Sequence, residues 1–230
     1  MAIDYTKRAA APPPASAPVS LSKVTLTKSA PSVSLTKQGA GNGILRVNLN
    51  WNPRPAAPSG GGFLKRLAAG ATATATDLDL GCLYEFTDGT KGVVQALGNS
   101  FTSRSAFTSD PVIRLDGDDR SGTQSGGENL FVNLAYTAQI RRILIFASIY
   151  EGASNWAAAA GVVTLYPANG PQIEVMLDDH DPKSRLCAIA MLEGTGGELS
   201  VRREVQYIHG GQQTLDKAYN WGMKWTAGRK

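Results

Sequence analysis

Residues 77–97 have the sequence DLDLGCLYEFTDGTKGVVQAL, in which two apolar segments flank a turn at Asp88-Gly89. A glycine after an aspartate supplies the positive φ that a tight hairpin turn requires. The pattern therefore predicts a β-hairpin with strands at Leu78–Phe86 and Lys91–Leu97. Helix is not favoured here, because the apolar residues of the first strand recur with a period of two.

Working outward from this hairpin, short strands follow one another along most of the chain. They are predicted at Ile44–Trp51, Val112–Leu115, Asn129–Leu134, Arg141–Tyr150, Val162–Tyr166, Gln172–Leu177, Leu186–Leu192 and Glu198–Ile208. Helix is expected only in short pieces, at Gln212–Tyr219, Ala135–Gln139 and Trp156–Ala160. Many short strands divided by glycine- and proline-bearing turns are typical of a sandwich. We therefore expect an all-β fold, an antiparallel β-sandwich with a few short helices.

The N-terminal region differs from the body. Residues 1–18 are rich in alanine and proline, and proline removes backbone donors and fixes φ, so we expect a disordered arm there and one domain over residues 19–230. A short motif then occurs three times, as Val19-Ser-Leu-Ser-Lys23, Val24-Thr-Leu-Thr-Lys28 and Val33-Ser-Leu-Thr-Lys37. Each copy alternates apolar and polar residues, the pattern of a short strand. At least the last copy should pair with the body, and an unused copy would be an exposed edge for self-assembly.

Composition excludes several classes of protein. The chain has 230 residues with 42% hydrophobic residues and no apolar run near the ~18 residues that span a bilayer, so no transmembrane segment is expected. With no secretory signal at Met1–Arg8, we expect a cytoplasmic protein. The net charge of +4 comes from a leader whose cations lack interleaved aromatics, so nucleic acid is not an expected partner. Cys82 and Cys187 lie in apolar strands and are predicted to be inert, reduced core thiols.

An acidic, glycine-rich segment is the main candidate for a functional site. It carries carboxylates at Asp110, Asp116, Asp118, Asp119 and Glu128. Carboxylates crowded on a loop repel one another unless a hard cation lies between them, and calcium prefers oxygen ligands of this kind. The segment therefore predicts a calcium-binding loop.

Strand parity adds two observations, one on a second acidic pair and one on Glu128. Asp77 and Asp79 share one face of their strand, opposite to the apolar residues of Leu78–Phe86, so one cation could contact both. An ordinary solvated strand face is the alternative reading of this pair. Parity also places Glu128 on the apolar face of its strand, where a carboxylate needs a partner. Glu128 therefore coordinates a cation, leans out of the end of the sheet or pairs with Arg120, and we favour the cation.

Signals for enzymatic chemistry are weak. The two histidines, His180 and His209, lie in no spacing that is diagnostic of zinc or of a nucleophile and its base. The acidic run Asp178–Asp181 before Pro182 is more typical of a solvated turn than of a catalytic cluster. No glycine-rich nucleotide loop or Gly-x-Ser-x-Gly motif is present. The sequence therefore predicts a protein that is not an enzyme.

The ordered set of motifs resembles the TerD/TerA family of bacterial tellurite-resistance and stress-response proteins. The motifs are Val-Ser-Leu-Thr-Lys37, Asp77-Leu-Asp-Leu80, Gly117-Asp-Asp-Arg-Ser-Gly122 and Glu128-x-x-x-Val-x-Leu134. Asn-Leu-Asn-Trp51, Gly60-Gly-Gly-Phe-Leu-Lys65 and Tyr150-Glu-Gly-Ala-Ser-Asn-Trp156 are closer to the TerA branch. The resemblance covers about Ser32 to Trp225.

The resemblance implies a calcium-binding β-sandwich without an established catalytic activity. Asp77, Asp79, Asp118, Asp119 and Glu128 fall on positions that match the family's ligands, and Asp110 falls near its loop-entry aspartate. The second half of the loop is shorter and less acidic than the family pattern, so we expect one calcium site and not two.

The resemblance also implies a function and partners. We expect a calcium-binding module or scaffold in tellurite resistance and the general stress response, whose partners are other stress-response proteins, the inner membrane surface being one place of contact. The alternative is a metal-free assembly protein that acts through its N-terminal strand repeats.

Overall fold

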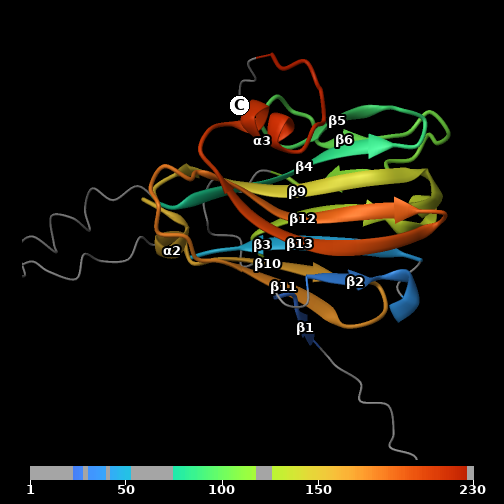
Figure 1. Ribbon diagram of the computed structural model, residues 1–230, viewed down its shortest axis with the longest axis horizontal. Helices are drawn as coiled ribbons and strands as arrows, with labels where there is room; N and C mark the ends of the chain where they lie inside the picture. Colours follow the sequence, from blue (N-terminus) through green and yellow to red (C-terminus); the bar gives the residue numbers. More distant parts are fainter. Residues whose placement is uncertain (1–22, 28–30, 40–41, 53–74, 118–125, 227–230) are drawn as a thin grey trace, which may run out of the picture.

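Two β-sheets packed face to face form the body of the protein (Figure 1). The structure is a computed structural model that describes residues 23–27, 31–39, 42–52, 75–117 and 126–226. The predicted N-terminal arm at residues 1–18 and most of the first repeat lie outside the described residues. The expected all-β sandwich with a few short helices is confirmed.

Sheet A contains seven strands within the described residues, in the order β1-β11-β10-β3-β8-β7-β6. Their bounds are Lys23–Thr25 (β1), Gln172–Leu177 (β11), Gly161–Tyr166 (β10), Ile44–Asn50 (β3), Glu128–Asn133 (β8), Ile113–Leu115 (β7) and Thr102–Ser103 (β6). All pairs in this sheet are antiparallel except β1 with β11, which is parallel. This one pair departs from the purely antiparallel arrangement that the sequence predicts.

Sheet B contains six described strands, in the order β2-β13-β12-β9-β4-β5, and all of its pairs are antiparallel. Their bounds are Ser32–Ser34 (β2), Glu198–Ile208 (β13), Leu186–Thr195 (β12), Ile140–Glu151 (β9), Asp77–Phe86 (β4) and Lys91–Val94 (β5). The predicted hairpin is confirmed as β4 and β5, and its turn glycine, Gly89, has φ +85°. The sequence patterns missed β6, a strand of two residues.

The helices are short, and three of the four were predicted. Their bounds are Thr36–Gln38 (η1), Leu134–Gln139 (η2), Trp156–Ala159 (α2) and Gln212–Ala218 (α3). Asn133 and Asn155 begin η2 and α2, because each side chain accepts a hydrogen bond from a backbone N–H of the first turn. None of the helices among the described residues is long and apolar enough to cross a membrane.

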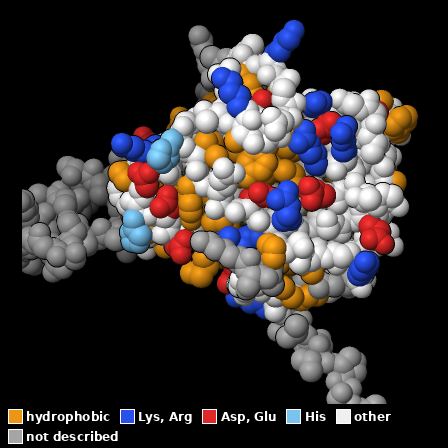
Figure 2. All heavy atoms as spheres, in the orientation of Figure 1, with side chains coloured by type: hydrophobic (Ala, Val, Ile, Leu, Met, Phe, Trp, Pro, Cys, Tyr) orange, Lys and Arg blue, Asp and Glu red, His pale blue; other side chains and the backbone are white. Residues whose placement is uncertain are grey.

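Two apolar clusters stabilise this arrangement. The larger one fills the space between the sheets and includes the predicted inner face of β4, with Leu78, Leu80 and Cys82 fully buried. The smaller one lies on the outer face of sheet B, where Leu215 and Trp221 pack on that sheet. Figure 1 shows α3 at the upper side of the sandwich, and Figure 2 shows apolar side chains exposed beside it on the same face.

The N-terminal repeats lie at the edges of both sheets. The last residue of the first copy and the first two of the second form β1 on sheet A, and residues of the third copy form β2 on sheet B. In the second and third copies the central leucine enters the main core, since Leu26 is 4% exposed and Leu35 is fully buried. The prediction that at least the last copy pairs with the body is confirmed.

Candidate metal site at the start of β4

Glu128 brings the two acidic segments together. It is the first residue of β8 and points between the sheets, where it is 1% exposed. There its Oε2 accepts a hydrogen bond of 2.6 Å from the backbone N–H of Leu80 in the opposite sheet. The neighbouring strand β5 pairs with Cys82 to Glu85, so Leu80 lies beyond that paired stretch. The predicted inward direction of Glu128 is therefore confirmed, and its carboxylate contacts the strand that carries Asp77 and Asp79.

Asp77 and Asp79 lie on the opposite face of β4 from its core residues. Asp77 is 5% exposed and Asp79 is partly exposed, so Asp77 does not lie on an ordinary solvated strand face. Alternate residues of one strand are about 6.6–6.8 Å apart, a separation that one cation can bridge. Glu128 approaches the same end of β4 from between the sheets, at the backbone N–H of Leu80.

Gly127 fixes the backbone just before Glu128. Its φ is +61°, and a Cβ added there would lie 2.0 Å from the carbonyl oxygen of Leu49. Only glycine fits so close to the neighbouring strand. Gly126 has no such constraint, since nothing lies within 4 Å of an added Cβ. Gly127 therefore positions the candidate ligand Glu128. The glycine content of the loop does not by itself show whether a given glycine has this role or only adds flexibility.

Asn48 holds the same end of the loop. Its side-chain amide is buried and donates hydrogen bonds to the carbonyl of Gly126 and, at 3.0 Å, to Oδ1 of Asn129. The sequence reasoning missed this residue. Its signal is a polar side chain in the middle of the strongly β-patterned Ile44–Trp51 segment.

The other predicted ligands are distributed along the loop and its neighbours. Asp116 directly follows β7, and its carboxylate accepts hydrogen bonds from the backbone N–H and the side chain of Asn129, at 3.1 and 3.0 Å. Asp110 precedes β7, at the far end of that strand from Asp116, and accepts a 3.0 Å hydrogen bond from the hydroxyl of Tyr136. Asp118, Asp119 and the competing Arg120 lie outside the described residues.

The described part of the chain has no group of three or more carboxylate, imidazole or thiol side chains placed to hold a metal ion. It does offer oxygen donors, buried carboxylates and rigid backbone at the ends of the acidic loop. That donor chemistry suits a hard cation such as calcium better than zinc or copper. The residues at the start of β4 thus fit part of a calcium site, and the rest of the ligand set would come from the loop.

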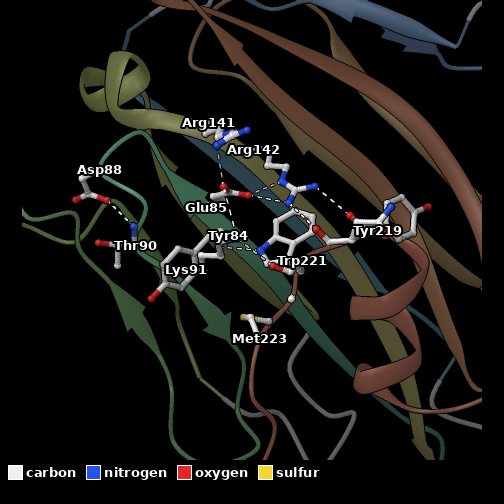
Figure 3. Close-up of polar contacts among 12 residues, drawn as sticks. Tyr84, Glu85, Asp88, Thr90, Lys91, Arg141, Arg142, Tyr219, Trp221 and Met223 are labelled. Atoms are coloured by element: carbon white, nitrogen blue, oxygen red, sulfur yellow. Dashed lines mark hydrogen bonds and ion pairs between the residues drawn. The ribbon is translucent and has the colours of Figure 1, made fainter.

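A second buried carboxylate, Glu85, has a different role (Figure 3). It is 3% exposed, and its oxygens contact Arg142 at 2.7 Å and Arg141 at 3.1 Å, with Lys91 at 3.8 Å. Burial by itself would raise the pKa of Glu85, but the hydrogen bond and charge of Arg142, with Lys91 and Arg141, lower it below its ordinary value. Three cations make Glu85 a structural ion-pair centre.

Arg142 connects this centre to the C-terminal segment. Its guanidinium lies 3.9 Å from the ring centroid of Trp221 and donates hydrogen bonds to the carbonyls of Tyr219 and Asn220. The indole N–H of Trp221 in turn donates to the carbonyl of Tyr84 at 3.0 Å. These contacts hold the chain after α3 against sheet B.

The acidic run Asp178–Asp181 forms a surface loop. Nε2 of His209 lies 2.7 Å from Oδ2 of Asp181, with 61% of the histidine side chain exposed. Tyr207 accepts a hydrogen bond from the backbone N–H of Asp178. Figure 2 shows both histidines at the surface with acidic side chains nearby. The loop is solvated, as the sequence indicates.

Both thiols are buried in the main core. Cys82 and Cys187 are free and fully buried, and burial raises the pKa of each thiol well above its ordinary value. A protonated, inaccessible thiol is a poor nucleophile and a poor reductant. The prediction of two core thiols is confirmed.

Comparison with known proteins shows one similar protein. No protein-family model matches the chain. Among curated proteins, it is 44% identical over 212 residues to the tellurium resistance protein TerA of an Alcaligenes species. The matched region covers 92% of this chain and 60% of that protein. The resemblance inferred from the motifs is thus confirmed, and the chain is similar to TerA over nearly all of its own length.

Proposed function

We propose that this chain acts in tellurite resistance and the general stress response as a non-enzymatic, calcium-binding module or scaffold. Its similarity to TerA, at 44% identity, supports the resistance role. The chain spans 60% of the length of that relative. The activity of the whole relative is therefore proposed for this chain and not taken from the similarity.

The observation that carries the calcium part is the position of Glu128. A carboxylate that is 1% exposed lies against β4, where it accepts a hydrogen bond from the backbone N–H of Leu80, the residue after Asp79. Carboxylate oxygens are the ligands that calcium prefers, and one calcium ion accepts several of them. A bound calcium ion would have Asp77, Asp79 and Glu128 as ligands, with Asp118 and Asp119 as the loop ligands that the family resemblance implies.

Two residues next to Glu128 would link a bound ion to the loop at the protein surface. The Leu80 N–H orients the Glu128 carboxylate, and Gly127 fixes the backbone through which Glu128 joins the loop. Ion binding would therefore order the loop between Gly117 and Gly126 and shape a surface for a partner. Asp116 is an outer member of the predicted set, because its carboxylate accepts hydrogen bonds from Asn129. Asp110 lies at the other end of β7, beside Ile44, and accepts a hydrogen bond from Tyr136.

Isothermal titration with calcium, together with the calcium-dependent shift in melting temperature, tests this proposal. Glu128→Gln keeps an oxygen that can accept the Leu80 N–H but removes the charge, and Asp79→Asn does the same at the second position. Each should weaken calcium binding by about tenfold or more, while Asp178→Asn, an exposed carboxylate on another loop, should leave it unchanged. Equal calcium affinity in all four proteins would refute the site.

The metal-free assembly alternative is favoured by a separate observation, the placement of β1 and β2. These two repeat copies already occupy one edge of each sheet, and edge strands are templates for further pairing. Deletion of residues 1–22 removes the first copy up to the residue before β1 and keeps Leu26 and Leu35 in the core. A large fall in oligomer size by light scattering would support assembly through the first copy, and an unchanged size would exclude that copy as the contact.

The remaining parts of the proposal follow from the family resemblance. We place the protein in the cytoplasm, with other stress-response proteins as partners and the inner membrane surface as one place of contact. No catalytic role is proposed, because the exposed His209–Asp181 pair and the buried thiols provide neither a positioned nucleophile nor an activated base.

A further inference from the structure

A row of four alternating aromatic and arginine side chains crosses the outer face of sheet A. Tyr166, Arg46, Phe131 and Arg114 are direct register partners on the consecutive strands β10, β3, β8 and β7. Their chain neighbours Leu45, Val47, Leu130, Val132 and Ile113 are fully buried, so the row points away from the core. We call these four residues the arginine–aromatic row.

Stacking fixes the two guanidiniums in the row. Arg46 lies 4.0 Å from the ring centroid of Tyr166, and Arg114 lies 4.4 Å from that of Phe131. Arg46 also donates a 3.1 Å hydrogen bond to Oδ1 of Asn129. One strand separates the two arginines, so they stand about 9–10 Å apart along the sheet. A guanidinium held in this way loses little entropy when it binds a planar anion.

Neither arginine forms an ion pair with a carboxylate of the described residues. Arg141, Arg142 and Arg202 all do. The nearby acids of the same face have other partners, since Asp116 accepts from Asn129 and Asp110 from Tyr136. Two fixed positive charges that no carboxylate of the described residues pairs with directly, in the middle of a sheet face, complement a partner that carries carboxylates.

Each end of the row opens into a hollow. A hollow of about 510 Å³ lies beside Arg114 and Phe131 and has apolar walls from Ile44 and Pro111. A second, of about 350 Å³, lies beside Tyr166 and is lined by the amides of Asn48 and Asn50. Ile44 is 45% exposed, although its β3 neighbours are buried. The surface therefore offers an apolar site next to one arginine and amide donors and acceptors near the other.

The row favours an acidic protein segment over other anionic partners. Sequence-tolerant binding of single-stranded nucleic acid needs open aromatic faces for the bases, and here guanidiniums already cover faces of Tyr166 and Phe131. Anionic membranes are bound by clusters of about 4–8 basic residues, more than this row provides. Arginine and aromatic residues are also the residue types most enriched at protein–protein hot spots.

We propose that the arginine–aromatic row docks an extended, acidic segment of a partner protein, with carboxylates paired to Arg46 and Arg114 and an apolar side chain in the hollow beside Ile44. The row itself contains no predicted calcium ligand. Asp110, which belongs to the predicted set, lines the hollow beside Ile44, at the far end of β7 from Asp116.

Fluorescence anisotropy of a labelled peptide tests the proposal with the full chain. The probe contains three repeats of Glu-Leu-Glu-Ser, and its matched control has glutamine in place of every glutamate. Measurements in the presence of a calcium chelator separate this surface from the calcium site. The acidic peptide should bind, the glutamine peptide should not, and the affinity should fall as salt is raised.

Variants identify the surface that binds. The double variant Arg46→Gln, Arg114→Gln should weaken binding of the acidic peptide by about tenfold or more. Ile44→Glu, which places a carboxylate at an exposed position in the hollow, should weaken it without touching either arginine. Arg104→Gln removes the same charge from an exposed position outside the row and should leave the affinity unchanged.

Three results would overturn the proposal. The first is that the acidic peptide does not bind. The second is that the double variant and the unaltered protein bind it equally well. The third is that an oligothymidine strand, and not the peptide, binds in a way that depends on the two arginines. Circular dichroism and melting temperature establish that each variant is folded. If the double variant does not fold, Ile44→Glu alone tests whether the peptide binds at this surface.

Discussion

At the scale of single residues, the position of Glu128 depends on the residue before it. Gly127 brings the chain so close to β3 that a Cβ would lie 2.0 Å from the carbonyl oxygen of Leu49, and its φ of +61° is one that other residues rarely adopt. Gly126, one residue earlier, has open space around it. Two adjacent glycines in the same loop therefore differ in what they contribute.

Substitution of each glycine by alanine measures this difference. Gly127→Ala should destabilise the protein by about 1–3 kcal/mol, because the methyl group forces the backbone away from Leu49. Gly126→Ala should change the free energy of unfolding by less than about 0.5 kcal/mol. Urea denaturation of both variants is the measurement, and equal stabilities would show that the close approach at Gly127 is not maintained in solution.

Glu85 gives a second prediction at this scale, on the pH dependence of stability. Its pKa is lowered below the ordinary value of 4.5, so the folded state favours its charged form. The stabilisation is therefore complete above about pH 4.5 and is lost as the pH falls through the lower folded-state pKa. Glu85→Gln should cost about 1–3 kcal/mol at neutral pH, since it removes a charge that is hydrogen-bonded to Arg142.

Denaturation curves at neutral pH and below pH 4.5 check this expectation. The difference in stability between the unaltered protein and Glu85→Gln should shrink as the solution becomes more acidic. Glu198→Gln, a change at an exposed carboxylate, is the matched control and should give a small difference at every pH. If the difference in stability between the unaltered protein and Glu85→Gln does not decrease as the pH falls, the role assigned to the ion pairs of Glu85 is wrong.

At the scale of elements, β1 and β2 are strands of three residues each that are held by the body. Strands this short have no independent stability. β2 pairs with Ser200 to Arg202 of β13, and the leucine that follows it, Leu35, is fully buried. A sequence repeat thus serves to close one edge of each sheet while placing one leucine in the shared core.

Truncation of the buried leucine separates core packing from edge pairing. Leu35→Ala should lower the free energy of unfolding by about 2–5 kcal/mol, the usual cost of a large-to-small change in a core. Thr25→Ala, at an exposed position of β1, should cost less than about 0.5 kcal/mol. If thermal or chemical denaturation showed no loss for Leu35→Ala, the third repeat would not be docked on the sandwich in solution.

At the scale of the whole molecule, the sandwich encloses both thiols. Cys82 on β4 and Cys187 on β12 are in the main core, where burial raises the pKa of each thiol. An oxyanion has no access to sulfur that is fully buried. A resistance role for this chain would therefore act through binding and not through direct reduction by cysteine.

The variant Cys82→Ala, Cys187→Ala tests that conclusion. We expect tellurite resistance in a complementation assay to be retained, with a loss of stability of about 1–3 kcal/mol from the two small cavities. Calcium titration and melting temperature of the purified variant control for folding. Loss of resistance by a variant with intact fold and calcium binding would mean that the thiols react.

Much of the fold could be read from local patterns. Period-two alternation, turn glycines and proline placement predicted most strands within a few residues, including the β4–β5 hairpin, and strand parity predicted that Glu128 points inward. These features depend on residues near one another in the chain, so the sequence by itself determined them. The motifs that resemble the tellurite-resistance proteins are local in the same sense.

Only the tertiary structure decided which strands are neighbours. The contact of Glu128 with Leu80, the clustering of three cations around Glu85 and the row that joins Tyr166 to Arg114 each combine residues from separate strands. The parallel β1–β11 pair and the register shift between Ala188 and Ala190 also depend on which surfaces pack together. Side-chain packing and backbone pairing between distant segments set these features, and no local pattern records the partner.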